Sequence, residues 1–392
     1  MSVTESASAT ATSLETARFA SRSVSDVSNT GSPATTGSGF NGSGTGVASA
    51  SGSASGTGLD RPVATILAGQ LVAALDSVLL GVGQASQLVV AAVLARGHVL
   101  VEDRPGVGKT LLAKTLAAAI GGTSARVQGS VDVLPADITG GLVLRNSGNG
   151  TSNNGTSNSG TDTNGTGNVS NDDPFRFMPG PIFHNVVIID ELNRISPRAQ
   201  AALLEAMEER HVTVDGQSRA LPDPFIVVAT QNHTSSAGTY PLLQGQIDRF
   251  TIGTTLGLPS AEAETALLLG TGGTTRLANL QTVCSPTELL RAQQATAAVH
   301  LAPQIAAYIV AIAQVTRDRL GEGKGASPRA SLMIAAIARS LAVMSARDYV
   351  SPDDVQNAVY PVLGMRLHGD TTESEARLRI ASYLADVPVP RP

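Results

Sequence analysis

Apolar residues along the chain alternate between two spacings, one typical of buried strands and one typical of helices. Short apolar runs predict strands over residues 98–102, 125–128, 186–189, 225–230 and 250–256. Helical spacing occupies residues 71–95, with a break near Gly81 and Gly83, then residues 110–120 and 197–210. Strands that alternate with helices predict an α/β fold in which helices cover both faces of a parallel sheet.

The strand pattern stops after Pro259. Helical spacing then continues over residues 261–269, 286–299, 303–317, 329–345 and 352–363. The chain therefore predicts an α/β domain over residues 59–258, followed by a small all-α domain over residues 259–392.

Two stretches lack either spacing. Residues 1–58 consist almost wholly of Ser, Thr, Gly and Ala, and residues 146–173 contain Val169 as their only large apolar side chain. Such segments cannot bury enough apolar surface to offset the entropy lost on ordering. We expect a disordered tail and a disordered insert within the α/β domain.

Charge and cysteine content narrow the function classes. The chain has 27 basic and 32 acidic residues, a net charge of −5, which disfavours a dedicated nucleic-acid binder. Cys284 is the single cysteine, so internal disulfides are excluded and a reducing cytoplasm is favoured. We expect its thiol to be a small buried hydrophobe rather than a nucleophile. No apolar run reaches the roughly 18 residues of a membrane span, and the first twenty residues lack the features of a signal peptide.

The segment Asp103-Arg-Pro-Gly-Val-Gly-Lys-Thr110 follows a predicted strand and opens a predicted helix, as a phosphate-binding loop does. Lys109 would reach the β- and γ-phosphates, and the Thr110 hydroxyl would bind Mg²⁺. Asp103 stands where the strict pattern has glycine, which leaves a chance turn as the alternative. The expected nucleotide contacts are Pro105, Gly106, Val107, Gly108, Lys109, Thr110 and Leu111.

Polar residues follow two further predicted strands. Asp190 and Glu191 end the strand near residue 189; Asp190 would hold Mg²⁺, and Glu191 would deprotonate the attacking water. Either carboxylate alone would fit a solvated acidic turn. Asn232 follows the next strand, where its amide would contact the γ-phosphate and the water. Taken alone, Asn232 is more typical of a turn.

Together these segments resemble the MoxR-type AAA+ ATPases, over roughly residues 60–370. The motifs that carry the resemblance, besides the phosphate-binding loop, are Leu134-Pro-Ala-Asp-Ile-Thr-Gly, Pro179-Gly-Pro-Ile-Phe183, Asp190-Glu-Leu-Asn-Arg, Leu203-Leu-Glu-Ala-Met-Glu-Glu-Arg210, Ala229-Thr-Gln-Asn232, Gly238-Thr-Tyr-Pro241, Asp248-Arg-Phe250, Gly325-Ala-Ser-Pro-Arg-Ala330 and Arg347-Asp-Tyr-Val. The resemblance implies a P-loop AAA+ core with a helical lid. It also implies a Mg²⁺-ATP hydrolase that works as a homo-hexameric ring and remodels partner proteins, often a von Willebrand A-type protein.

The resemblance also implies roles for individual residues. Lys109 and Thr110 match the Walker A positions, Asp190 and Glu191 match Walker B, and Asn232 matches sensor 1. Two arginines complete the set.

Arg329 matches sensor 2, which would contact the γ-phosphate from the lid. Arg249 resembles an arginine finger delivered to a neighbouring subunit; an intrachain salt bridge is the alternative, and Arg194 is the second candidate for an intersubunit contact. Three charged residues of the helix near 197–210 are expected to form only a solvated face: Arg198, Glu208 and Arg210.

The chain departs from the family at three places. His233 replaces a proline, Leu243-Gln244-Gly245 replaces Pro-Glu-Ala, and the insert interrupts a hairpin that would face the pore or a partner. None of these positions is expected to touch the phosphates. The favoured function is an ATP-driven remodelling machine. The alternative is a nucleotide-gated binding scaffold in which turnover is incidental, and a nucleic-acid motor comes third.

Overall fold

The computed structural model describes residues 57–104, 106–144, 174–231, 238–321, 325–367 and 373–390. The expected tail lies outside this range up to residue 56, and the expected insert, residues 146–173, lies outside it entirely. Two of the expected site residues, Pro105 and Asn232, also fall outside the described residues.

A five-stranded parallel sheet forms the centre of the α/β region. Its order is β2-β5-β8-β1-β9, with β1 (Val99–Glu102), β2 (Ser124–Gln128), β5 (Val186–Asp190), β8 (Ile226–Gln231) and β9 (Ile252–Thr254). The register sets Val101 beside Thr230, and Gln128 beside Asp190. The carboxyl ends of β1, β5 and β8 therefore meet at one edge, where open α/β sheets bind ligands.

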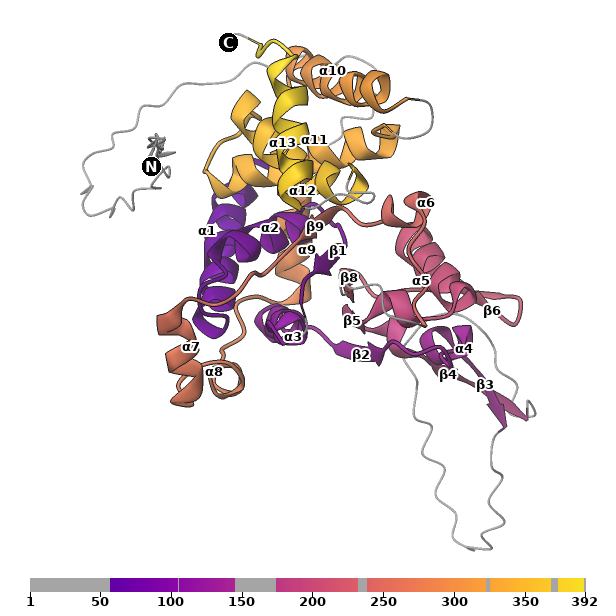
Figure 1. Ribbon diagram of the computed structural model, residues 1–392. Helices are drawn as coiled ribbons and strands as arrows, with labels where there is room; N and C mark the ends of the chain where they lie inside the picture. The colour runs from indigo at the N-terminus through magenta and orange to yellow at the C-terminus, as the bar shows by residue number, and fades with distance from the viewer. Residues whose placement is uncertain are drawn as a thin grey trace, which may run out of the picture. The chain divides into compact units, whose positions relative to one another are not determined.

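Helices cover both faces of this sheet, as the strand composition predicts (Figure 1). On one face lie α1 (Thr57–Val78), α2 (Gly83–Leu94) and α3 (Lys109–Ala119), and on the other lie α4 (Pro135–Thr139) and α5 (Pro197–Glu209). Within β5, Val186 and Ile188 join the core around α1–α3, whereas Val187 and Ile189 join the core around α5. Burial on both faces explains the uninterrupted apolar run of this strand.

Two antiparallel hairpins project from the α/β region. Strand β3 (Gly140–Leu144) pairs with β4 (Phe175–Pro179), on either side of the insert, and β6 (His211–Val214) pairs with β7 (Gln217–Ala220). The second hairpin was not expected from the apolar pattern, because neither of its strands contains a run of apolar residues. Its turn is marked by Asp215 and Gly216, which have φ values of 51° and 75° and form the Asp-Gly pair that tight hairpins favour.

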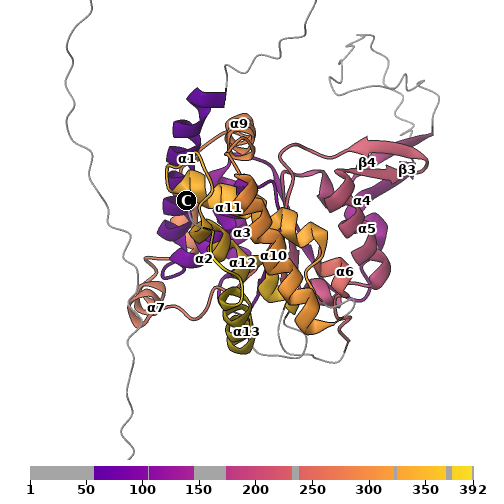
Figure 2. The ribbon, with the colours of Figure 1, turned by 90° about the horizontal axis from the view of Figure 1, so that it is seen from above.

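The expected all-α region follows the sheet (Figure 2). Its helices, after the short α6 (Gln244–Ile247), are α7 (Ala261–Leu268), α8 (Thr274–Ala278), α9 (Pro286–Ala297), α10 (Pro303–Leu320), α11 (Pro328–Met344), α12 (Pro352–Leu367) and α13 (Glu373–Ala385). Helix α9 packs on α1 and α2, and α12 packs on β9. The fold class is confirmed, whereas the domain boundary after residue 258 stays a prediction. Across the described ranges, no helix combines the length and apolar content that a membrane span requires.

Candidate nucleotide-binding site

The predicted phosphate-binding loop connects β1 to α3. Gly106 and Gly108 have φ values of 88° and 99°, in the left-handed region that glycine adopts at little cost. Gly108 is the residue before α3, so Lys109 and Thr110 form the first turn of the helix. Backbone N–H groups of a first helical turn have no partner within the helix, and they suit an anion such as a phosphate.

The ammonium group of Lys109 lies at the carboxyl edge of the sheet. Its Nζ donates to the carbonyl oxygen of Asp103 at 2.6 Å and to that of Gln231 at 3.1 Å. Burial lowers the pKa of Lys109, and the carboxylates of Asp103, Glu191 and Asp190 act in the opposite direction. The Walker A lysine and both predicted Walker B acids are therefore close enough to interact electrostatically.

Thr110 and Asp190 contact each other directly across 80 residues of sequence. The Thr110 hydroxyl donates to Oδ1 of Asp190 at 3.1 Å and to Oδ2 at 3.0 Å. Hydroxyl and carboxylate oxygens are ligands that a hard cation such as Mg²⁺ prefers, so this pair fits the expected metal. Arg126 of β2 donates from Nε to Asp190 Oδ2 at 2.6 Å. No motif marks Arg126; only the neighbouring positions of β2 and β5 bring it here.

Glu191 has an unusual backbone conformation at the end of β5. Its φ of 57° places a non-glycine residue in the left-handed region, which costs roughly 1 kcal/mol or more and often occurs at functional sites. The Glu191 N–H donates to Thr230 Oγ1 at 3.1 Å, which helps to hold this conformation. Arg194, the second candidate for an intersubunit contact, pairs with Glu191 of its own chain at 3.1 Å and ends the short helical turn η2 (Leu192–Arg194).

The contacts of Asp103 account for an aspartate at the position where the strict pattern has glycine. Its Oδ2 accepts hydrogen bonds from the backbone N–H groups of Leu256 at 2.9 Å and Gly257 at 2.8 Å, and its Oδ1 accepts one from Arg104. A glycine could not make these contacts. The carboxylate ties the start of the loop to the segment that follows β9.

Apolar side chains from three separate elements lie beside the loop. A Cβ built on Gly108 would lie 3.6 Å from Leu79, and one built on Gly273 would lie 3.3 Å from Leu267 and 3.9 Å from Leu111. The ends of α1 and α7 therefore approach the start of α3. Leu111 was an expected contact, whereas no sequence motif marks Leu79 or Leu267.

The two expected sensor and finger arginines share one carboxylate. Glu208 of α5 pairs with Arg249 Nε at 3.1 Å and also with Arg329 Nη2. The intrachain salt bridge considered for Arg249 is thus present, with Glu208 as the acid. In Figure 1, α6, which precedes Arg249, lies on the other side of the labelled strands β5 and β8 from α3.

The expectation of a merely solvated face on α5 was wrong for two of its three residues. Glu208 binds the two arginines, and Arg210 donates to the carbonyl oxygens of Phe225 at 3.2 Å and Arg96 at 2.6 Å. Arg198 is exposed, as expected. Long-range partners, which lie far away in the sequence, account for the error.

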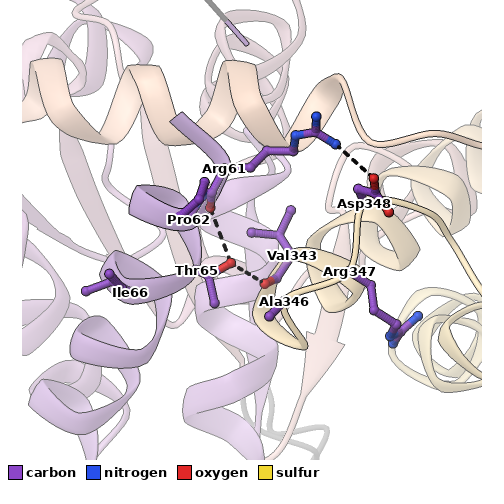
Figure 3. Close-up of a pocket in the computed structure, with 8 residues that line it drawn as sticks. All are labelled: Arg61, Pro62, Thr65, Ile66, Val343, Ala346, Arg347 and Asp348. Atoms are coloured by element: carbon purple, nitrogen blue, oxygen red, sulfur yellow. Dashed lines mark hydrogen bonds and ion pairs between the residues drawn. The ribbon is translucent and has the colours of Figure 1, made fainter. Parts of the chain in front are cut away.

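A separate cavity of about 480 Å³ lies between the start of α1 and the connection from α11 to α12 (Figure 3). Its lining residues are Arg61, Pro62, Thr65, Ile66, Val343, Ala346, Arg347 and Asp348. Thr65 donates to the Val343 carbonyl at 2.8 Å, and Arg61 approaches Asp348 at 3.6 Å. None of these residues belongs to the expected nucleotide site.

Comparisons with known proteins agree with this geometry. The model of the ATPase family associated with various cellular activities (AAA) matches residues 98–156 and 160–252, and the AAA lid domain matches residues 316–381. The chaperone MoxR1 of Mycobacterium tuberculosis is 36% identical over 299 residues, which cover 74% of this chain and 72% of MoxR1. This chain belongs to the MoxR-type AAA+ ATPase family.

Two further proteins match this MoxR-type ATPase over nearly the whole of their own length. The protein YeaC of Bacillus subtilis is 37% identical over 331 residues, which cover 83% of this chain and 96% of YeaC. A crystal structure of a protein provisionally assigned as an ATPase, from Cytophaga hutchinsonii, superimposes with a TM-score of 0.71 at 25% identity. It covers 85% of this chain and 98% of that one. Both the sheet region and the helical region therefore have counterparts in known proteins.

Proposed function

We propose that this chain binds and hydrolyses Mg²⁺-ATP at the carboxyl edge of its parallel sheet. The observation that carries the proposal is the meeting of the Thr110 hydroxyl with the Asp190 carboxylate at 3.0–3.1 Å, beside the buried Lys109 ammonium. A hydroxyl, a carboxylate and an ammonium at the start of a helix are the groups that phosphoryl transfer requires.

Each residue has a distinct task in this proposal. Lys109 exchanges its carbonyl partners for the β- and γ-phosphate oxygens, and the N–H groups around Gly106–Thr110 bind the same phosphates. Thr110 and Asp190 are the residues that would hold Mg²⁺, which neutralises phosphate charge when it is bound. Glu191 orients and deprotonates the attacking water, and Asn232 contacts both the water and the γ-phosphate.

The apolar side chains beside the loop suit the other end of the nucleotide. Leu79 lies beside Gly108, and both Leu111 of α3 and Leu267 of α7 lie beside Gly273. Flat, weakly polar groups bind in pockets lined with apolar side chains. We assign this position to the adenine base, with the phosphates extending toward Lys109.

Arg249 is proposed to act on the nucleotide of a neighbouring subunit in a homo-hexameric ring, and Arg329 is proposed to contact the γ-phosphate from the lid. Both pair with Glu208 on α5, which packs on the face of the sheet opposite α3. An arginine finger supplied by a neighbour stabilises charge in the transition state and contributes about 10³–10⁵ in rate.

The cellular task proposed for this ring is chaperone-like remodelling of a partner protein. The similar protein MoxR1 is named a chaperone, which supports this task. A von Willebrand A-type protein is the expected class of partner. The alternative is a nucleotide-gated scaffold. Partner-stimulated ATP hydrolysis favours the machine, whereas partner release on nucleotide exchange without turnover favours the scaffold.

Variants at three positions test the site and the ring together. Lys109→Ala should abolish ATP binding, whereas Arg249→Ala should keep ATP affinity and lose turnover. Mixing Arg249→Ala subunits with Glu191→Gln subunits should restore hydrolysis, because each supplies what the other lacks. Absence of recovery in the mixture would show that Arg249 does not act on a neighbouring site.

A further inference from the structure

Arg366 is an arginine buried near the end of α12, where its side chain is 1% exposed. Its Nε donates to Asp248 Oδ1 at 2.8 Å, and its Nη2 donates to the carbonyl oxygen of Phe250 at 2.7 Å. Its Nη1 donates to the Val362 carbonyl of the preceding helical turn. Asp248 and Phe250 are the two sequence neighbours of Arg249, so the guanidinium group contacts the Asp248 side chain before the proposed finger and the Phe250 backbone after it.

A buried ion pair joins two elements only at the cost of removing both charges from water. Burial lowers the pKa of Arg366, and the Asp248 carboxylate acts in the opposite direction. Apolar residues of similar volume often stabilise a protein at least as well as such a pair. The planar fork of an arginine offers instead hydrogen bonds in fixed directions. Its contribution here is therefore best understood as the orientation of the 248–250 segment.

Two further contacts fix α12 against the same segment. Gln244 of α6 donates from Nε2 to the Arg366 carbonyl oxygen at 3.0 Å. On the other side, a Cβ built on Gly253 of β9 would lie 2.7 Å from Met365 Cβ, so only glycine permits this approach. The whole connection from α6 to β9, which carries Arg249, thus rests on the end of α12.

The side chain of Arg249 extends from this fixed base toward the surface. It is 31% exposed, and its Nη1 donates to the Gly245 carbonyl at 2.8 Å. Its Nε pairs with Glu208, which also binds Arg329 at the start of α11. The helical region is therefore linked to the finger segment in two ways. Arg366 contacts the segment directly, and Arg329 shares the Glu208 carboxylate with Arg249.

We propose that Arg366 is a positioning residue that sets the placement of Arg249, so that the helical region of one subunit aims the finger used by the next. The inference rests on the proposed role of Arg249 in a neighbouring site. It adds a direction of control: a shift of α12 displaces the 248–250 segment and changes hydrolysis in the adjacent subunit, not in its own.

The first test compares three variants by steady-state hydrolysis. Arg366→Lys keeps the charge but loses the fork, and Asp248→Asn weakens the same contact from the partner side chain, which is 18% exposed. Each should lower kcat about a hundredfold, the effect of a misplacement near 1 Å, while the KM for ATP changes less than about twofold. The control is Arg347→Lys, which removes the fork in the same way from the Arg347–Asp354 pair at the start of α12, with Nη2 to Oδ1 at 2.6 Å. This control should keep kcat.

The second test asks in which subunit the defect acts. Arg366→Lys subunits keep an intact nucleotide site, and Glu191→Gln subunits keep an intact finger. A one-to-one mixture should recover hydrolysis at roughly a quarter of the interfaces of a randomly assembled ring. The Arg249→Ala and Glu191→Gln mixture calibrates this recovery, and gel filtration confirms that each variant assembles.

The outcomes separate the two proposals. Recovery with both Arg249→Ala and Arg366→Lys supports the positioning role. Recovery with Arg249→Ala but not with Arg366→Lys overturns the positioning role and leaves the proposed function intact, and unchanged kcat in both Asp248→Asn and Arg366→Lys does the same. No recovery in either mixture overturns the action of Arg249 on the neighbour, and the positioning role with it.

Discussion

The buried imidazole of His98 should make the folded chain less stable in mild acid. The ring lies in the core just before β1, where Nδ1 accepts the Val227 N–H at 3.0 Å and Nε2 donates to the Met207 carbonyl at 3.2 Å. Burial and, to a smaller extent, the positive charge of Arg210 together lower the pKa of His98 from 6.5 to about 3. The folded chain thus holds a neutral imidazole at a pH where the unfolded chain takes up a proton.

The size of the effect follows from this difference in proton uptake. Between pH 6.5 and about 3 the unfolded state binds the extra proton, so stability falls as the pH falls, at about 1.36 kcal/mol per pH unit. At about pH 5, which is 1.5 units below the unfolded pKa, His98 alone should remove about 2 kcal/mol from the free energy of unfolding. Near pH 7 its effect is almost zero.

The assay is urea unfolding at about pH 7 and about pH 5, for the wild-type chain and for His98→Gln. Glutamine can donate and accept hydrogen bonds but does not titrate, so the difference between the two pH values should shrink by about 2 kcal/mol. Carboxylates contribute equally to both chains and cancel. His211→Gln, at an exposed position, is the matched control and should behave as the wild type. An unchanged pH difference in His98→Gln would refute the argument.

Two further predictions concern backbone contact and thiol chemistry. In Gly129→Ala a Cβ would collide with the carbonyl oxygens of Glu191 and of Asp190, the latter at 2.7 Å; ATP hydrolysis should be lost, whereas Gly141→Ala, where a Cβ meets nothing within 4 Å, should retain it. Burial, aided by the charge of Glu288, raises the pKa of the Cys284 thiol to about 11. Iodoacetamide at about pH 8 should therefore alkylate the native chain about a hundredfold more slowly than the urea-unfolded chain, because the thiolate is the reactive form; equal rates would contradict the burial argument.

The sequence predicted those parts of the site whose geometry follows from the order of elements along the chain. A strand, a glycine loop and a helix in succession place Lys109 and Thr110 at the start of α3. Acids at the carboxyl end of a parallel strand must lie at the same edge, and Asp190 indeed contacts Thr110. These contacts needed only the parallel arrangement of the strands, which the alternation of elements predicts.

Contacts between distant segments could not be predicted in this way. Glu208 lies 121 residues from Arg329 in sequence, and Arg366 lies 118 residues from Asp248. A glutamate on an exposed helix face and an arginine at a helix end look the same whether they are solvated or paired. Only the packing of α11 and α12 against α5 and β9 decides between these states.

Some elements were missed, and one helix is longer than expected. The hairpin β6–β7 has no apolar run to mark it, and α13 lies beyond the last helical spacing recognised. Helix α1 begins at Thr57, 14 residues before the helical spacing expected from residue 71. Its upstream turns bury Ala64, Leu67 and Ala68, which continue the helical spacing toward the N-terminus and were left out of the expected helix.

The most direct test of the central claim is phosphate release from purified chain supplied with Mg²⁺ and ATP, measured beside ATP binding for the wild type and Glu191→Gln. The wild type should bind ATP and release phosphate over many turnovers. Glu191→Gln should bind ATP with similar affinity and release almost none, since the base is gone while Lys109, Thr110 and Asp190 remain. Comparable phosphate release by both chains would contradict the assignment of Glu191 and the proposed site.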